Sequence, residues 1–180
     1  NTEFLTELIE GLSYIAHDYN LLTCHNFHTD IPDGINRSIN INVPTWLEFI
    51  EMWDEYLDVI GLDIYPNYYS SDISRVYDIV YNRIKDVQRI TNKPVWILET
   101  FIPVAEQGIE LPALINFTEE NQNNYYKQIL AATLNSGCDG FFQFRINEGN
   151  GITSNNLDDR DLRALSLFQE AFETGNIQKL

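Results

Sequence analysis

The chain has 180 residues, the length of one domain with a substantial apolar core, and we expect residues 1–180 to form a single domain. Asp and Glu number 27 against 11 Lys and Arg, and the resulting net charge of −16 repels phosphate backbones and anionic bilayers. No run approaches the roughly 18 apolar residues of a membrane span, so neither nucleic acid nor a membrane is an expected partner, whereas neutral substrates such as sugars are compatible with this charge.

The first elements in chain order are an amphipathic helix, a short strand and a second helix. Residues 4–19 carry apolar side chains at helical spacing with acids between them. Residues 21–27 follow as a strand, and a polar loop containing Gly and Asn extends over residues 29–43. Thr45 is a good N-cap for the next helix, whose apolar face continues to Leu57.

The central part begins with a strand and a long helix. Residues 59–65 form a largely apolar run that is stopped by Pro66, because proline cannot continue a central strand. Ser71 or Asp72 can cap the helix that follows. Apolar residues at helical spacing carry this helix to Ile90.

Residues 93–100 predict a buried strand that ends in a carboxylate. Glu is a poor strand former and is costly to bury, so Glu99 is either solvated at a rim or retained for chemistry. In α/β proteins, ligands bind at the carboxyl ends of the strands. Strict alternation places Glu99 on the same side as Val95 and Ile97. If Glu99 points inward, we therefore expect Trp96 to point outward, against the helices.

The last part predicts a helix, a strand and a final helix. Thr118 opens a helix that ends at Gly137, a residue type that commonly terminates helices. Residues 138–145 contain several aromatic side chains and are the fourth predicted strand. After a loop rich in Gly and Asn, a final helix is expected over residues 158–173.

One helix is thus followed by four strand–helix units. Regular alternation predicts an α/β fold with a parallel sheet and helices outside it. The loops that follow the strands are long and polar, whereas the connections that enter the strands are short. This distribution is typical of a TIM barrel, whose active-site face is built from the loops after the strands. A doubly wound open sheet gives similar spacing and is the alternative, although no Gly-rich phosphate loop follows any strand.

Ordered motifs carry a family resemblance. Residues 58–66 end in Tyr-Pro, residues 93–100 end in Glu-Thr, and residues 137–145 combine small residues, an acid, Gly and aromatics. In this order they resemble barrel strands six, seven and eight of the TIM-barrel retaining glycoside hydrolases, the clan that includes cellulases, mannanases, galactanases and β-galactosidases. Residues 22–28 would then be strand five. The resemblance implies that this chain supplies the last four strand–helix units of a (β/α)8 barrel and the preceding helix.

The resemblance also implies an enzyme that cleaves β-glycosidic bonds by a retaining double displacement, with Glu99 as nucleophile. Tyr65, at the end of the neighbouring strand, is expected to donate its phenol to Glu99 and to keep it ionised; the alternative is a core tyrosine. The residues expected to bind substrate are His25, Asn67, Arg145, Phe144 and Asp63. Phe144 stands where many relatives use Trp, and Asp63 either contacts a sugar hydroxyl or stabilises the barrel interior.

Retaining hydrolysis needs two carboxyl groups about 5 Å apart, and in the clan the second one closes barrel strand four. Strands one to four have no counterpart in this sequence. Glu3 lies near the corresponding place, but Asn does not precede it, so we expect the acid/base outside this chain. A half barrel leaves open strand edges. We therefore expect this chain to be a piece of a longer protein that supplies the N-terminal half, a proteolytic product, or one part of a dimer whose second chain closes the barrel.

Two other functions stay open. A barrel fragment would bind carbohydrate without turnover, because one carboxylate cannot serve both catalytic roles. A metal-dependent hydrolase would use His25 and His28 as ligands. However, residues three apart on a strand face opposite sides, and the sequence contains no His-x-His. We therefore expect no metal and no other cofactor.

Overall fold

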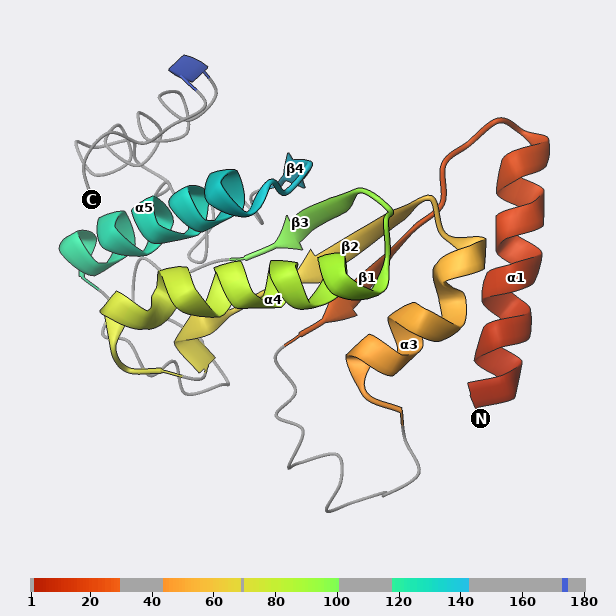
Figure 1. The fold of residues 1–180 in the computed structure, drawn as a ribbon, viewed down its shortest axis with the longest axis horizontal. Helices are drawn as coiled ribbons and strands as arrows, with labels where there is room; N and C mark the ends of the chain where they lie inside the picture. The colour runs from red at the N-terminus through yellow and green to blue at the C-terminus, as the bar shows by residue number, and fades with distance from the viewer. Residues whose placement is uncertain (1, 30–43, 69, 101–117, 143–172, 175–180) are drawn as a thin grey trace.

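The computed structural model describes residues 2–29, 44–68, 70–100, 118–142 and 173–174 (Figure 1). Within these ranges, four strands form one parallel sheet in the order β1–β2–β3–β4. The strands are β1 (Cys24–His28), β2 (Val59–Asp63), β3 (Val95–Glu99) and β4 (Gly140–Phe141). The helices that precede and connect them are α1 (Thr2–Asp18), α3 (Trp46–Trp53), α4 (Val76–Ile90) and α5 (Glu119–Ser136).

The spatial order of the strands follows their order in the chain. Right-handed crossovers between successive parallel strands place every connecting helix on the same face of the sheet. A doubly wound sheet would instead reverse its strand order at a switch point. The described helices α3, α4 and α5 pack together with the sheet in one hydrophobic core (Figure 1). The predicted parallel sheet with outer helices is therefore confirmed, in the sequential order that a barrel wall requires.

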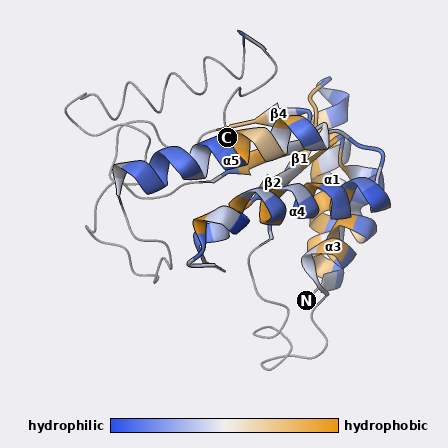
Figure 2. Cartoon of the chain, turned by 60° about the vertical axis from the view of Figure 1, so that its left-hand side comes forward, coloured by the Kyte–Doolittle hydropathy of each residue, from blue (hydrophilic) through white to orange (hydrophobic). Residues whose placement is uncertain are grey.

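The hydrophobic core lies between the sheet and these helices. Alternate residues of β2 and β3 point into it, and α4 meets them with residues three or four positions apart. The fully buried members on these elements are Ile60, Leu62, Val95, Ile97, Val76, Val80, Ile84 and Val87. Burying one such side chain contributes about 1.5–3 kcal/mol. In Figure 2, the first part of α5 is hydrophilic and the part toward β4 is largely hydrophobic, while α4 shows both hydrophilic and hydrophobic residues, as expected for helices that pack one side on a core.

The ends of α3 and α5 follow the predicted signals, whereas Asp72 caps a 3₁₀ turn (Ile73–Arg75) that precedes α4, and within the described residues α4 itself has no side-chain cap at its start. The Thr45 side chain accepts a hydrogen bond from the backbone N–H of Glu48 at 3.2 Å, and the Glu48 carboxylate accepts from the backbone N–H of Thr45 at 2.6 Å. This reciprocal capping box starts α3. Thr118 caps α5, and Gly137 ends that helix with a φ angle of 71°, which glycine adopts without a steric penalty.

Helix α1 forms as predicted, but most of its apolar side chains are exposed. Only Ser13 is buried on this helix. The side chain of Thr6 accepts a hydrogen bond from the Trp53 indole at 3.0 Å, which ties α1 to α3. The exposed apolar residues of α1 are Phe4, Leu5, Leu8, Leu12 and Ile15, with exposures between 41% and 61%. Among the described helices, none is long and apolar enough to cross a bilayer.

The face of the sheet opposite this core carries Trp96. A Cβ atom on Gly140 of the neighbouring strand would meet the Trp96 ring, so the ring lies over that glycine. The centroid of the ring is 5.6 Å from that of Phe142. Val95 and Ile97, in contrast, are buried in the core against the helices. The prediction that Trp96 points outward against the helices is therefore wrong.

Candidate active site

The carboxyl ends of β1, β2 and β3 bring polar side chains into one row. In the sheet register, His28 pairs with Asp63, and Asp63 pairs with Glu99. Backbone hydrogen bonds continue past these positions: the N–H of Thr29 donates to the Asp63 carbonyl at 3.1 Å, and the N–H of Ile64 donates to the Glu99 carbonyl at 2.8 Å. The strand ends are thus held in register up to the residues that carry chemistry.

A β-bulge in β3 decides where the Glu99 carboxylate points. The pairing of β2 with β3 shifts by one residue just before Asp63, which pairs with Glu99 and leaves Leu98 as an extra residue. Leu98 lies on the face opposite the helices, where a Cβ atom on Gly61 would meet its side chain. Simple alternation would then turn Glu99 toward the helices. The extra residue lets Glu99 follow Leu98 on the same side, so the predicted alternation fails at this position.

Tyr65 donates its phenol hydrogen to the Oε2 atom of Glu99. The tyrosine is 5% exposed and the glutamate is partly exposed, so the pair lies between the core and the open face. The bond holds one carboxylate oxygen and leaves the other oxygen able to meet a ligand. Hydrogen bonds to the charged form of a carboxyl stabilise that form. The arrangement therefore suits a carboxylate that reacts as an anion.

Asp63 is a second carboxyl group at this sheet edge. It is 8% exposed, and its Oδ1 atom accepts a hydrogen bond from the Asn26 amide at 3.2 Å. Burial, followed by the negative charge of Glu99, raises the pKa of Asp63 to about 6, while the bond from Asn26 acts in the opposite direction. A raised pKa at a carboxyl in a strand-end row of polar side chains is a pattern found at functional sites.

His28 is exposed at the end of β1 and lies beside the tyrosine of the site. Its ring centroid is 5.4 Å from that of Tyr65, with an angle of 44° between the planes. Desolvation lowers the pKa of His28, and the negative charge of Glu99 opposes this effect. A neutral imidazole carries one donor and one acceptor nitrogen. His28 is therefore suited to bind a hydroxyl group next to Glu99.

His25 was expected to bind substrate, but the structure places it on the helix-covered face. Its ring packs edge-on against Phe27 at 4.9 Å and against Trp53 of α3 at 5.2 Å. Burial lowers its pKa. Because side chains alternate along β1 and Phe27 belongs to the core, His28 and not His25 shares the face with Asp63. The alternation of β1 in the sequence is the signal that distinguishes the two histidines.

Asn67, another expected substrate-binding residue, is fully buried in a short 3₁₀ turn (Pro66–Tyr68) after β2. Its Oδ1 atom accepts a hydrogen bond from the phenol of Tyr125 at 3.1 Å. Its Nδ2 atom has no hydrogen-bond partner within the described part of the chain. Tyr125, on α5, has no motif around it in the sequence that would single it out. Arg145 and Phe144 lie outside the described residues.

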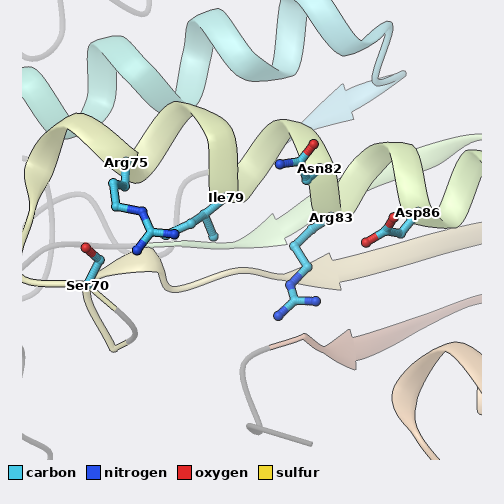
Figure 3. A pocket seen from close by; sticks show the side chains of 6 residues that line it. All are labelled: Ser70, Arg75, Ile79, Asn82, Arg83 and Asp86. Atoms are coloured by element: carbon cyan, nitrogen blue, oxygen red, sulfur yellow. The ribbon is translucent and has the colours of Figure 1, made fainter.

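The described residues contain no group of three or more His, Cys, Asp or Glu side chains that could hold a metal ion. Glu3, considered as acid/base, is exposed in the first turn of α1. A hollow of about 270 Å³ lies along the flank of α4 (Figure 3). It is lined by Ser70, Arg75, Ile79, Asn82, Arg83 and Asp86. None of the strand-end residues lines this hollow, so it is separate from the row that contains Glu99.

No protein-family model and no curated protein sequence matches the chain. Solved structures do match it. A glycoside hydrolase family 17 β-1,3-glucanosyltransferase from Rhizomucor miehei has a TM-score of 0.65 and 16% identity, over 89% of this chain and 57% of its own. An endo-β-1,4-mannanase from Thermotoga petrophila has a TM-score of 0.61 and 18% identity, over 97% and 41%. A glycoside hydrolase family 128 endo-β-1,3-glucanase from Amycolatopsis mediterranei has a TM-score of 0.59 and 13% identity, over 89% and 64%.

The chain therefore spans between 41% and 64% of the length of these structures. At such low identity the similarity concerns the fold and not the reaction. The parallel sheet in sequential order, the outer helices and these matches agree. The chain has the α/β fold of the TIM-barrel glycoside hydrolases and corresponds to part of such a barrel.

Proposed function

We propose that the chain is part of a retaining glycoside hydrolase in which Glu99 is the nucleophile. The observation that carries this proposal is the contact between the Tyr65 phenol and the Glu99 carboxylate at the carboxyl end of parallel strands. In a TIM barrel this end of the sheet holds the active site. The similarity in fold to a glucanosyltransferase, a mannanase and a glucanase supports the same reaction class.

In the proposed reaction, an oxygen of Glu99 attacks the anomeric carbon while the bond to the leaving-group oxygen breaks. That oxygen takes a proton from an acid outside the described residues. Water, deprotonated by the same group, then attacks the anomeric carbon and releases Glu99. Tyr65 fixes the orientation of the Glu99 carboxylate through its hydrogen bond to Oε2. His28 and Asp63 flank the site from β1 and β2 and offer hydrogen bonds to sugar hydroxyls.

The second proposed requirement is a complete barrel. Strand β1 is at an edge of the described sheet, and Leu21 and Leu22 just before it are 61% and 73% exposed. The apolar side chains of α1 lie exposed as well. An unpaired strand edge beside exposed apolar side chains is a surface that pairs with further strands and helices. We propose that a preceding half of the barrel, or a second chain, covers it and provides the acid/base.

Covalent trapping tests the proposed function. The protein that contains the complete barrel is incubated with 2-fluoro glycosides bearing an activated leaving group, which form a glycosyl-enzyme that hydrolyses slowly. We expect a mass increase of one fluorosugar, located on the peptide that contains Glu99. Glu99→Gln should abolish labelling, and Tyr65→Phe should slow it by about 10-fold or more, as expected when a hydrogen bond that preorganises a reacting group is removed.

The matched control is Glu48→Gln, which changes a carboxyl group in the capping box of α3 and should leave labelling intact. Labelling that persists in Glu99→Gln would refute the assignment of the nucleophile.

A second candidate is carbohydrate binding without turnover. The register places Asp63 beside Glu99 on the adjoining strand, not across a cleft, so the described part of the chain offers no carboxyl facing Glu99 as acid/base. This candidate predicts no labelling of the complete protein. It also predicts that oligosaccharide affinity, measured by calorimetry, is equal for the wild type and Glu99→Gln.

A further inference from the structure

Tyr125 of α5 connects the two strand ends that carry the candidate site. The side chain is fully buried. Its phenol donates to the Oδ1 atom of Asn67 at 3.1 Å and lies 3.3 Å from the Oγ1 atom of Thr100. Because the phenol has one proton, and this proton goes to Asn67, the hydroxyl of Thr100 is the donor in the second contact. The result is a chain of hydrogen bonds from Thr100 through Tyr125 to Asn67.

Both ends of this chain adjoin the residues of the site. Thr100 follows Glu99 directly, and Asn67 is two residues after Tyr65. Thr100 is 1% exposed, and Asn67 is fully buried. The carboxylate and the phenol of the site are thus in contact at the strand ends, while the residues that follow them are fastened to α5 inside the core.

We propose that Tyr125 is a positioning residue of the Glu99 site, a role that rests on the proposed function of that site. Its hydroxyl holds the ends of β2 and β3 at a fixed separation, and this separation keeps the phenol of Tyr65 on the Glu99 carboxylate. A hydrogen-bonded network in a low-dielectric core has cooperative strength and fixes a single arrangement of its members. Misplacement by about 1 Å far from the reacting atoms lowers rates by about 100-fold.

The amide of Asn67 provides independent support. Tyr125 fixes the amide oxygen toward α5, and among the described residues the amide nitrogen has no hydrogen-bond partner, although Asn67 is fully buried. Native cores rarely leave a buried donor unpaired, so such an atom calls for a specific explanation, of which a role in binding or catalysis is one. Tyr125 thus orients Asn67 so that one donor stays open for an oxygen atom that enters with a ligand.

The test replaces only the hydroxyl, with Tyr125→Phe in the full chain. Tyr126→Phe is the matched control, because Tyr126 is the next residue of α5, is equally buried and packs edge-on against Tyr125 at 5.7 Å. The readout is the hydroxyl proton of Tyr65, observed by NMR as a downfield signal that Tyr65→Phe removes. This signal reports the Tyr65–Glu99 contact without any turnover.

We expect Tyr125→Phe to shift this signal upfield or broaden it beyond detection and Tyr126→Phe to leave it in place. In the complete enzyme, kcat should fall by about 10-fold or more in Tyr125→Phe, with KM changed by less than about 2-fold. An unchanged signal in Tyr125→Phe, or equal loss in both variants, would overturn the proposal.

Thr100→Val keeps the shape of the side chain and removes the hydroxyl at the other end of the network. If Tyr125→Phe does not fold, Thr100→Val replaces it in the test, and we expect the same change in the NMR signal of the Tyr65 hydroxyl proton. If no turnover or trapping is found, the proposed function fails, but the NMR comparison still decides whether Tyr125 holds the contact.

Discussion

Two carboxyl groups at neighbouring strand ends have different surroundings. Glu99 accepts the phenol hydrogen of Tyr65, whereas Asp63, on the adjoining strand, is 8% exposed and accepts an amide hydrogen from Asn26. Burial and the neighbouring charge of Glu99 raise the pKa of Asp63 to about 6. A group of this kind destabilises the folded state once it ionises. The ionisation of Asp63 therefore makes the stability of the fold depend on pH.

The Asp63→Asn variant tests this reasoning. A carboxyl whose pKa is raised from 3.8 to about 6 on folding loses stabilisation as the pH rises through that window. Asn keeps an oxygen for the Asn26 amide and carries no charge. We expect the variant to be about 1 kcal/mol more stable than the wild type at pH 8 and nearly equal at pH 4, measured by urea unfolding. The full shift sets a limit of about 3 kcal/mol, which solvent near the sheet edge reduces.

The control for this prediction is Asp78→Asn, which changes an exposed carboxyl on α4. The difference between this variant and the wild type should be the same at both pH values. A variant at Asp63 that is less stable than the wild type at pH 8 would contradict the assigned pKa direction.

The sequence could predict that Glu99 and Tyr65 are neighbours. Each lies at the end of an apolar run, and parallel strands end at the same edge of a sheet. The sequence could not predict the direction of Glu99, because the extra residue Leu98 is visible only in the pairing with β2. Alternation with Phe27 along β1 correctly places His28 on the face of the candidate site, whereas the family resemblance pointed to His25. The role of Tyr125 depends on contacts 25 and 58 residues away in the chain, which no local pattern contains.

Among the secondary-structure elements, the amino end of the sheet is fastened by Asp58, which precedes β2. Its Oδ2 atom accepts from the backbone N–H of Thr23 at 2.8 Å and lies 2.8 Å from the Nε2 atom of His17, at the end of α1. The bond from Thr23, followed by that from His17, lowers the pKa of Asp58 to about 2. One carboxylate thus joins α1, β1 and β2 at the edge opposite the candidate site, where barrel residues serve stability.

The Asp58→Asn variant should lose about 1 kcal/mol of folding stability at pH 7, after allowance for screening at this partly exposed position. The pKa is lowered on folding, so the stabilisation is present above about 3.8 and disappears as the pH falls toward about 2. The difference between variant and wild type should shrink over the same window in acid unfolding experiments.

Asp86→Asn is a suitable comparison, because Asp86 forms an exposed ion pair with Arg89 at 2.6 Å on α4. Exposed pairs of this type contribute little. Equal losses of folding stability in Asp58→Asn and Asp86→Asn would show that the contacts of Asp58 with Thr23 and His17 contribute no more than an exposed ion pair.

For the molecule as a whole, the main consequence of the fold is an uncovered flank. Helix α1 carries four acids and no Lys or Arg, and its apolar residues are exposed between those acids. The amphipathic pattern of α1 was correctly predicted from the sequence. The sequence could not predict what packs on the apolar face of this helix, because the pattern defines the face and not its partner. The solved structures that share the fold are longer than this chain.

In the 180-residue chain, we expect this flank to drive self-association. Replacing Leu8 and Leu12, which are 46% and 53% exposed, by Lys should lower the sedimentation coefficient to that of a single chain and leave the helical circular dichroism unchanged. Met52→Lys changes a 39% exposed residue on α3 and should have no such effect. Identical sedimentation of the wild type and the double variant would contradict this expectation.

The bulge at Leu98 also determines how β3 would respond to losing one residue. If Leu98 were deleted, Glu99 would follow the core residue Ile97 directly, and regular pleating would place the carboxylate on the face of Asp63, where it already lies. A gene variant that lacks only the Leu98 codon should therefore keep the carboxylate on the same face of the sheet, unlike loss of the glutamate itself.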